Sequence, residues 1–325
     1  DPTGFEEAVA TAEDEVRVEF SRLLDEESLD EDGDQFMTDP ELDISGAEVD
    51  GNVVTLTTES QEVGEEYTLS LDDSADQPLQ DRLGMDVGEE DETTTFFGYE
   101  EPAEVVINEI NSQISGNCDL LEIRVTEGGS MNGFSFIERD DPLVNFGEGF
   151  SVETDDIVVI HFRSEDENCN PDGASMEVEA TDEEAEADFG GNFDDAYDWW
   201  TDETTLTDTD NVLRVEDATG EIVDAVFLVD DEGGCEDYDA ANPTEDAAEV
   251  VADADEWETP DGEVPDDGFV GQDFCENAVG GFAETSDDAG GTSLQRDGDT
   301  DNNNLEDWTD QNDSSWGALN EGQGN

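Results

Sequence analysis

The charge balance of this chain constrains its fold more than any other feature. Ninety-eight Asp and Glu residues stand against eight basic residues, all of them arginine, because the chain contains no lysine. Low hydropathy with such a net charge is typical of disordered chains, since the carboxylates repel one another. At molar ionic strength the Debye length falls to about 3 Å, and this repulsion is screened. The composition therefore predicts a protein of an extreme halophile that needs high salt in order to fold.

The apolar content is high enough to build a core. Hydrophobic residues make up 34% of the chain and 31 glycines add to them, which brings the chain close to the roughly 45% of globular domains. The length of 325 residues favours two domains. We expect a small α+β domain over residues 1–101 and a β-rich domain over residues 102–325, with the boundary in the acidic stretch around Pro102.

The first domain is expected to begin with one amphipathic helix. Apolar residues recur at spacings of three and four, with acidic residues on the other faces. These apolar residues are Phe5, Ala8, Val9, Ala12, Val16, Phe20 and Leu23. Thr3 and Glu6 fit a capping box at the start, and the acidic run around Gly33 is typical of a helix end. We expect this helix to pack on a sheet.

Short strands are expected to complete the first domain. Alternating apolar residues predict strands at residues 52–58, 67–71 and 93–99. The connection through Glu59 and Gly64 indicates that the first two strands form a hairpin.

The second domain shows short alternating strands separated by turn residues and no helical periodicity. Its longest interruption is residues 164–210, which contain Trp199 and Trp200. Because a purely solvated loop does not favour two tryptophans, we predict an insertion that folds back and is held through Cys169. Long acidic stretches, such as residues 182–188, are interpreted as hydrated surface.

Six short motifs follow one another in this domain. They are Val105–Ile110 (VVINEI), Asp119–Ile123 (DLLEI), Met131–Glu138 (MNGFSFIE), Ile157–Phe162 (IVVIHF), Val212–Val229 (VLRVEDATGEIVDAVFLV), and a closing series of Ser293–Arg296 (SLQR), Asp299–Asn302 (DTDN), Asp307–Trp308 and Trp316–Asn320 (WGALN). Their order resembles a lamin tail domain, although Leu120 and Trp316 replace that family's usual tryptophan and proline. The resemblance implies an immunoglobulin-like β-sandwich, a fold that mostly binds or builds.

The four cysteines indicate disulfides. Cys118, Cys169, Cys235 and Cys275 form no CxxC pair and have no histidines nearby for a metal site. We predict two structural disulfides and therefore an oxidising, extracytoplasmic compartment. Of three pairings, Cys118 with Cys169 and Cys235 with Cys275 is favoured, and the alternative is four buried free thiols.

The chain starts at Asp1 without an apolar leader and has no run of 18 apolar residues. We expect a mature secreted protein whose leader has been removed and which does not itself insert into a membrane. The alternative is an N-terminal anchor that has been cut away.

Little in the sequence points to catalysis. The only histidine, His161, lies in an apolar run where a structural role is the better interpretation. Without a second histidine or any lysine, the chain lacks most of the side chains that usually activate a nucleophile. Carboxylate pairs of the glycosidase kind are uninformative, because acids are everywhere. We therefore predict that the protein is not an enzyme and assign no catalytic residue.

A calcium loop is the one metal site that the sequence suggests. Oxygen ligands recur at alternate positions in Asp297, Asp299 and Asp301, followed by Asn302, Asn303 and Glu306. The EF-hand pattern fails, however, where Asn302 replaces its glycine and Trp308 its final glutamate. The motif also belongs to the lamin-tail resemblance, so calcium or another cation stays a hypothesis and no other cofactor is expected.

These observations predict a non-catalytic extracellular or cell-surface protein with a structural or adhesive role, such as a subunit of an appendage, matrix or virion-like assembly. Its partners are expected to be proteins, with self-association. Nucleic acid is excluded as a partner because no basic patch is present. The alternatives are an accessory module associated with secreted nuclease or hydrolase activity, which the lamin-tail resemblance suggests, and a receptor-binding module.

Overall fold

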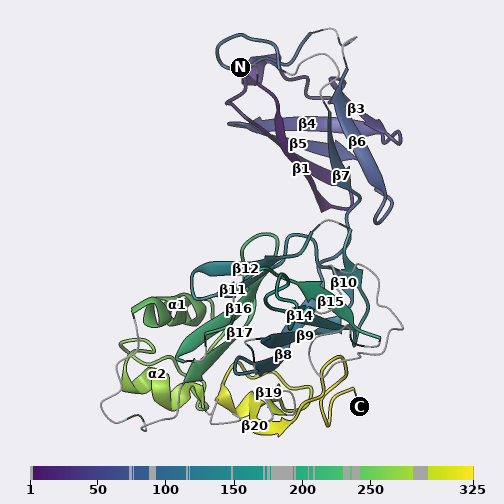
Figure 1. Ribbon diagram of the computed structural model, residues 1–325. Coiled ribbons are helices and arrows are strands. Elements are labelled where there is room, and N and C mark those ends of the chain that lie inside the picture. Colours follow the sequence, from purple (N-terminus) through teal and green to yellow (C-terminus); the bar gives the residue numbers. More distant parts are fainter. Residues whose placement is uncertain are drawn as a thin grey trace. The chain divides into compact units, whose positions relative to one another are not determined.

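The computed structural model describes residues 3–72, 75, 77–87, 93–114, 116, 118–147, 149–170, 173, 176, 193, 195–203, 205–207, 209–229, 235, 242–280 and 292–324. The chain divides into two compact units, Asp1–Glu101 and Pro102–Asn325, and each is described by itself. Among the described residues, strands hold 42% and helical elements 9%, so the prediction of a mainly β protein is confirmed (Figure 1).

Unit 1 consists of two antiparallel sheets around one core. One sheet has the strand order β1-β2-β5-β4 and the other the order β3-β6-β7. The strands are β1 (Phe5–Ala12), β2 (Glu15–Phe20), β3 (Phe36–Asp39), β4 (Ile44–Asp50), β5 (Val53–Thr58), β6 (Glu66–Leu71) and β7 (Thr93–Phe97). Both sheets supply the core, which includes Val16, Val18, Phe20 and Leu56 from the first and Phe36, Tyr67, Leu69 and Phe96 from the second.

The amphipathic helix predicted at the start of unit 1 is wrong, because this segment is the hairpin β1–β2. Apolar positions 8, 12, 16 and 20 are four residues apart, a spacing that fits both a helix and a strand whose period is two. The alternation of buried Val16, Val18 and Phe20 with the more exposed charged residues between them settles the choice. Thr3 caps no helix; it forms a β-bridge with Val87.

Unit 1 is therefore a β unit and not the expected α+β domain. Among its described residues the only helical element is the 3-10 turn η1 (Glu26–Ser28). The three predicted strands are present as β5, β6 and β7. The predicted hairpin is wrong, however, because β5 and β6 lie in different sheets. Gln61 holds this crossover by donating to the Ala12 carbonyl and accepting from the Tyr99 amide.

Unit 2 is built around two larger sheets. Their strand orders are β15-β14-β9-β8-β19-β20 and β12-β11-β16-β17-β18, and β10 pairs with β13 beside them. The strands are β8 (Glu104–Asn111), β9 (Leu120–Glu127), β10 (Gly129–Ser130), β11 (Ser135–Glu138), β12 (Asp141–Asn145), β13 (Ser151–Val152), β14 (Ile157–His161), β15 (Tyr197–Trp200), β16 (Asn211–Glu216), β17 (Ile222–Val229), β18 (Val279–Gly280), β19 (Thr292–Arg296) and β20 (Trp308–Asp313).

One apolar core joins the two sheets of unit 2. It includes Ile107, Ile123 and Ile160 from the six-stranded sheet, and Phe136, Val215 and Phe227 from the five-stranded sheet. Both sheets contribute to this one core, as expected for a β-sandwich. Strands predicted from the six motifs are present as β8, β9, β11, β14, β16, β17 and β19.

Two helices in unit 2 contradict the expectation that this region has no helical periodicity. They are α1 (Asn242–Asp253) and α2 (Gln272–Asn277), and both contact β17. In α1, Ala247, Ala248, Val251 and Ala252 are buried, which is the spacing of one helix face. Because these residues are mostly alanine, their apolar stripe is weak in the sequence.

The insertion returns to the sheet as expected. Its strand β15 pairs in parallel with β14, which joins His161 to Trp200 in register. Trp199 and Trp200 are each only 4% exposed, so neither lies in a solvated loop. The acidic run at residues 182–188 lies outside the described residues.

Candidate functional site

The loop after β19, where calcium ligands were expected, is occupied by arginine ion pairs. Asp299 lies 2.6 Å from Nη1 of Arg124, and Asp301 lies 2.9 Å from Nη1 of Arg296. Asp297 is exposed. Across the described residues, no three His, Cys, Asp or Glu side chains gather as metal ligands would. Two of the three predicted carboxylates therefore neutralise buried guanidinium groups.

Asp307 closes this loop. Its carboxylate accepts hydrogen bonds from the amide of Asn302 at 2.8 Å, from the Asn302 side chain, and from the amide of Asn304. It also completes a capping box with Asn304 at the 3-10 turn η2 (Leu305–Asp307). The DTDN motif thus forms a structural turn that carries the chain from β19 into β20.

Arg296 is the centre of this network. Its Nη2 donates to both carboxylate oxygens of Asp224 at 2.8 Å, and its Nε donates to the Ile107 carbonyl at 2.9 Å. Its guanidinium carbon also lies 5.3 Å from the ring centre of Trp308, within range of a cation–π contact. Burial raises the pKa of Asp224 to about 7, although the charge of Arg296 acts in the opposite direction.

A cavity of about 470 Å³ lies beside these ion pairs. Its charged lining comprises Glu104, Arg124, Glu221, Glu256, Arg296, Asp299 and Asp301. Desolvation, and then the charge of Asp301, raises the pKa of Glu256. Because both arginines are already paired with carboxylates, the remaining charged side chains of the lining, Glu104, Glu221 and Glu256, are all acidic.

A second polar cluster surrounds two buried glutamates on neighbouring strands, Glu109 on β8 and Glu122 on β9. Glu122 accepts from the Asn108 side chain at 2.7 Å and from the Gly317 amide at 2.8 Å. Glu109 accepts from the hydroxyl of Ser293 at 2.6 Å and from the amide of Ser315 at 3.0 Å. Burial raises the pKa of both glutamates, and the charge of Glu109 raises that of Glu122 further.

Ser315 lies between the carboxylate of Glu109 and the side chain of Asn320. Its hydroxyl lies 2.8 Å from Oε2 of Glu109 and 2.7 Å from Oδ1 of Asn320, yet one hydroxyl proton cannot serve two acceptors. The Asn320 amide is oriented by its own donation to the backbone carbonyls of Asn108 and Arg296. Ser315 and Asn320 together connect Glu109 of β8 to the C-terminal segment.

His161 occupies a structural position. Its Nε2 lies 2.5 Å from Oδ1 of Asp198, and its ring stacks on Trp200 at 4.0 Å between centroids. The other carboxylate oxygen of Asp198 accepts from the Phe193 amide at 2.8 Å. The pair therefore joins β14 to the returning end of the insertion, in agreement with the structural role expected for this histidine.

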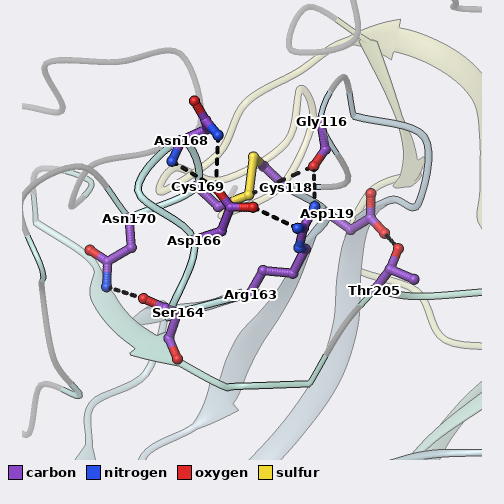
Figure 2. Close-up of a disulfide and its surroundings, with 10 residues drawn as sticks. All are labelled: Gly116, Cys118, Asp119, Arg163, Ser164, Asp166, Asn168, Cys169, Asn170 and Thr205. Atoms are coloured by element: carbon purple, nitrogen blue, oxygen red, sulfur yellow. Dashed lines mark hydrogen bonds and ion pairs between the residues drawn. A yellow bond between two sulfur atoms is a disulfide. The ribbon is translucent and has the colours of Figure 1, made fainter.

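The disulfides join Cys118 to Cys169 and Cys235 to Cys275, the pairing favoured from the sequence. Figure 2 shows Arg163 beside the first bond, between Gly116 and Asp166. Arg163 donates to the Gly116 carbonyl at 2.6 Å and to Asp166 at 2.5 Å. The start of the insertion is therefore fixed to the β8–β9 connection by a covalent bond and by the hydrogen bond from Arg163 to Gly116.

Asp119 adds a further tie near this disulfide. Its carboxylate accepts from the Thr205 hydroxyl (Figure 2) and from the Leu206 amide at 3.0 Å. Hydrogen bonds from Arg163, and from Thr205 and Leu206 further along the chain, thus reach the same short segment just before β9. The sequence indicated the cysteines but gave no sign of these polar partners.

The buried charged residues were the part of the site that sequence reasoning missed. Glu109, Glu122 and Asp224 each interrupt an apolar strand, and that interruption was the available signal. Arg124 and Arg296 are two of only eight basic residues, so their scarcity was a second signal.

A family model named TP_1001_2nd, described as a protein second domain, matches residues 103–309. The chain belongs to this family. The TP_1001_2nd domain contains both disulfides and most of the ion-pair network of unit 2. This match does not test the resemblance to a lamin tail domain, which stays a prediction.

Solved structures of the bacterial S-layer protein SbsC are also similar to the chain. Its N-terminal part is 14% identical with a TM-score of 0.29, over 49% of this chain and 40% of that one. The rSbsC(31-844) structure is 11% identical with a TM-score of 0.27, over 70% of this chain and 41% of that one. The chain thus spans about two fifths of these proteins, and no conclusion about function follows at this similarity. No curated protein matches the chain.

The described helices are short. The longest, α1, has 12 residues, and none of them has the length and apolarity required to cross a bilayer.

Proposed function

We propose that the protein is a non-catalytic structural protein of the cell surface or extracellular space, which associates with further copies of itself in a surface layer, appendage, matrix or particle. The supporting observation is that the chemically versatile side chains of unit 2 hold its fold together. His161 is bound to Asp198, Arg296 to Asp224, and the four cysteines to one another. Disulfides of this kind persist in oxidising compartments.

The surrounding medium is part of this proposal. A formal net charge of −90 is compatible with closely packed copies only where ions screen it. We therefore assign the protein to a hypersaline environment, in which dissolved cations, calcium among them, accompany the acidic surface. In dilute buffer the same charge should oppose both folding and association.

Electron microscopy and sedimentation velocity of the purified protein, in salt from about 0.1 M to the molar range, test the proposal. Filaments, sheets or particles at high salt would support it. A protein that stays monomeric at every salt concentration would contradict self-association. In parallel, incubation with DNA and with polysaccharides tests the non-catalytic assignment, since cleavage by the protein but not by a denatured sample would overturn it.

A further inference from the structure

A loop at one end of unit 1 presents an apolar side chain on a firmly held backbone. The carboxylate of Asp81, only 1% exposed, accepts from the amides of Leu83 at 2.9 Å and Met85 at 3.0 Å, and from the Thr3 hydroxyl at 3.0 Å. The backbone closes on itself, since the Asp81 amide donates to the Met85 carbonyl at 2.9 Å. Leu83 at its tip is 76% exposed, the most exposed large apolar side chain of the described residues.

A neighbouring segment extends this apolar surface. The Arg82 amide donates to the Leu23 carbonyl at 3.0 Å, and Leu24 forms a β-bridge with Asp81. Leu23 is 48% exposed and Met85 is 42% exposed. Ordered apolar side chains that remain exposed on two adjoining segments are typical of an interaction surface.

Two arginines, Arg22 and Arg82, precede Leu23 and Leu83 on these two segments. The side chains of Arg22 and Arg82 are 39% and 54% exposed, whereas those of Arg124 and Arg296 are 8% and 3% exposed in short ion pairs. The closest carboxylates to Arg22 and Arg82 lie at 3.8 and 3.6 Å, and Nε of Arg82 donates to the Leu24 carbonyl at 3.3 Å. We define the tip patch as Arg22, Leu23, Arg82, Leu83 and Met85.

Unit 1 has two ends. The chain leaves unit 1 at one end, and the tip patch lies at the other end. The leaving end is marked by Gly98, whose carbonyl accepts from the Gly64 amide. The patch instead adjoins the start of β1, where Thr3 bridges to Val87. The connection to residue 102 therefore does not occupy the patch.

We propose that the tip patch binds an acidic face of a second copy of this chain. Contact between two tip patches would bring arginine against arginine, which is repulsive, whereas almost any other face of a chain with 98 acidic residues offers carboxylates. The contact is therefore between unlike surfaces, head to tail. Such a contact propagates into open chains or layers instead of closing as a symmetric dimer. This inference rests on the self-association proposed above and adds its surface.

The experiment compares full-length variants by sedimentation velocity in the salt in which the wild type assembles. Leu83→Ser and Arg82→Glu are each expected to weaken association by about tenfold or more, as loss of a central contact does. Val63→Ser is the matched apolar control, because Val63 is 65% exposed at the opposite end of unit 1. Arg17→Glu is the matched charge control, with a side chain 40% exposed on β2.

The outcomes separate this proposal from the function on which it rests. A monomeric wild type would contradict the self-association, and the tip patch would lose its partner. If the wild type assembles and the tip variants assemble like the controls, the tip-patch proposal is wrong while self-association stands. Closed dimers of the wild type would also contradict the tip-patch proposal, because a head-to-tail contact does not close. Thermal unfolding shows whether each variant is folded, and Leu83→Ala and Arg82→Gln replace any variant whose midpoint falls.

Discussion

Arg296 of β19 and Asp224 of β17 join the two sheets of unit 2 through a buried ion pair. One nitrogen of the guanidinium group donates to both carboxylate oxygens at 2.8 Å, and the side chains are 3% and 1% exposed. Breaking such a pair leaves an uncompensated buried charge, which is more costly than losing an exposed pair. The pair is therefore a fixed point of contact between the six-stranded and the five-stranded sheet.

Replacement of this arginine should be costly in a manner that depends on pH. We expect Arg296→Met to lower the free energy of unfolding by about 3–5 kcal/mol at pH 8, where Asp224 must either stay charged without a partner or take up a proton that the unfolded chain would release. At pH 5 the loss should be smaller, since a carboxyl with a pKa of about 7 can take up a proton. Denaturant titration measures both values. Arg17→Met, at an exposed pair, should cost about 0–1 kcal/mol, and equal losses in the two variants would contradict the prediction.

The wild-type protein should become more stable as the pH falls from above 7 towards 4. The pKa of Asp224 is raised from 3.8 to about 7 in the folded state, and those of Glu109 and Glu122 are also raised. A raised carboxyl pKa means that the folded state binds the proton more tightly, so its stabilisation is present below the unfolded pKa and lost as the pH rises through about 7. Unfolding at saturating salt measures this slope without the surface repulsion.

The Asp224→Asn variant is the control for that slope. It removes one titrating group, so its stability should change less between pH 4 and 7 than that of the wild type. A wild type whose stability rises with pH over this range would contradict the prediction. Below this range the lowered pKa of Asp81, caused chiefly by its backbone hydrogen bonds, should make stability fall again.

The C-terminal segment should depend on the amide of Asn320. This residue is 3% exposed, and its side chain donates to backbone carbonyls on two strands. Asn320→Ala should cost about 1–3 kcal/mol, because buried polar groups lose their partners. Asn168→Ala, at an exposed asparagine, should cost less. Comparable thermal midpoints for the two variants would show that residues around 320 contribute little to stability.

The disulfides should stabilise unit 2 by constraining its unfolded chain. The cysteines are separated by 51 and 40 residues, for which loop closure predicts about 4 kcal/mol each. Paired replacement of Cys235 and Cys275 by serine should therefore lower the unfolding free energy by about that amount. Mass spectrometry of the native protein after thiol labelling checks the bonds themselves, and four labelled cysteines would contradict them.

The elements that could be predicted from the sequence are those with the strongest local patterns. Strands with continuous apolar runs, such as β14 and β17, were predictable because period and composition agree there. The β1–β2 hairpin was not, since a spacing of four residues between Ala8, Ala12 and Val16 is common to helix and strand. Helix α1 was missed because alanines form its buried face and signal burial weakly.

The site was less predictable than the fold, because it depends on pairs that are distant in sequence. Asp299 and Asp301 were expected to bind calcium from their alternate spacing, yet each lies against an arginine. One of these arginines, Arg124, is 175 residues away from Asp299. Spacing along the chain carries no information about such a partner. The cysteine pairing favoured from the sequence, by contrast, agrees with the structure, and each bond joins neighbours in the cysteine order.

The position of β19 has a consequence for how this protein is made. This strand lies between β8 and β20 in the six-stranded sheet. Strand β8 therefore pairs with a strand that is synthesised about 180 residues later. Unit 1 is contiguous and can acquire its structure during synthesis. Unit 2 must stay unfinished, with the edge of β8 open, until residues 292–313 have emerged.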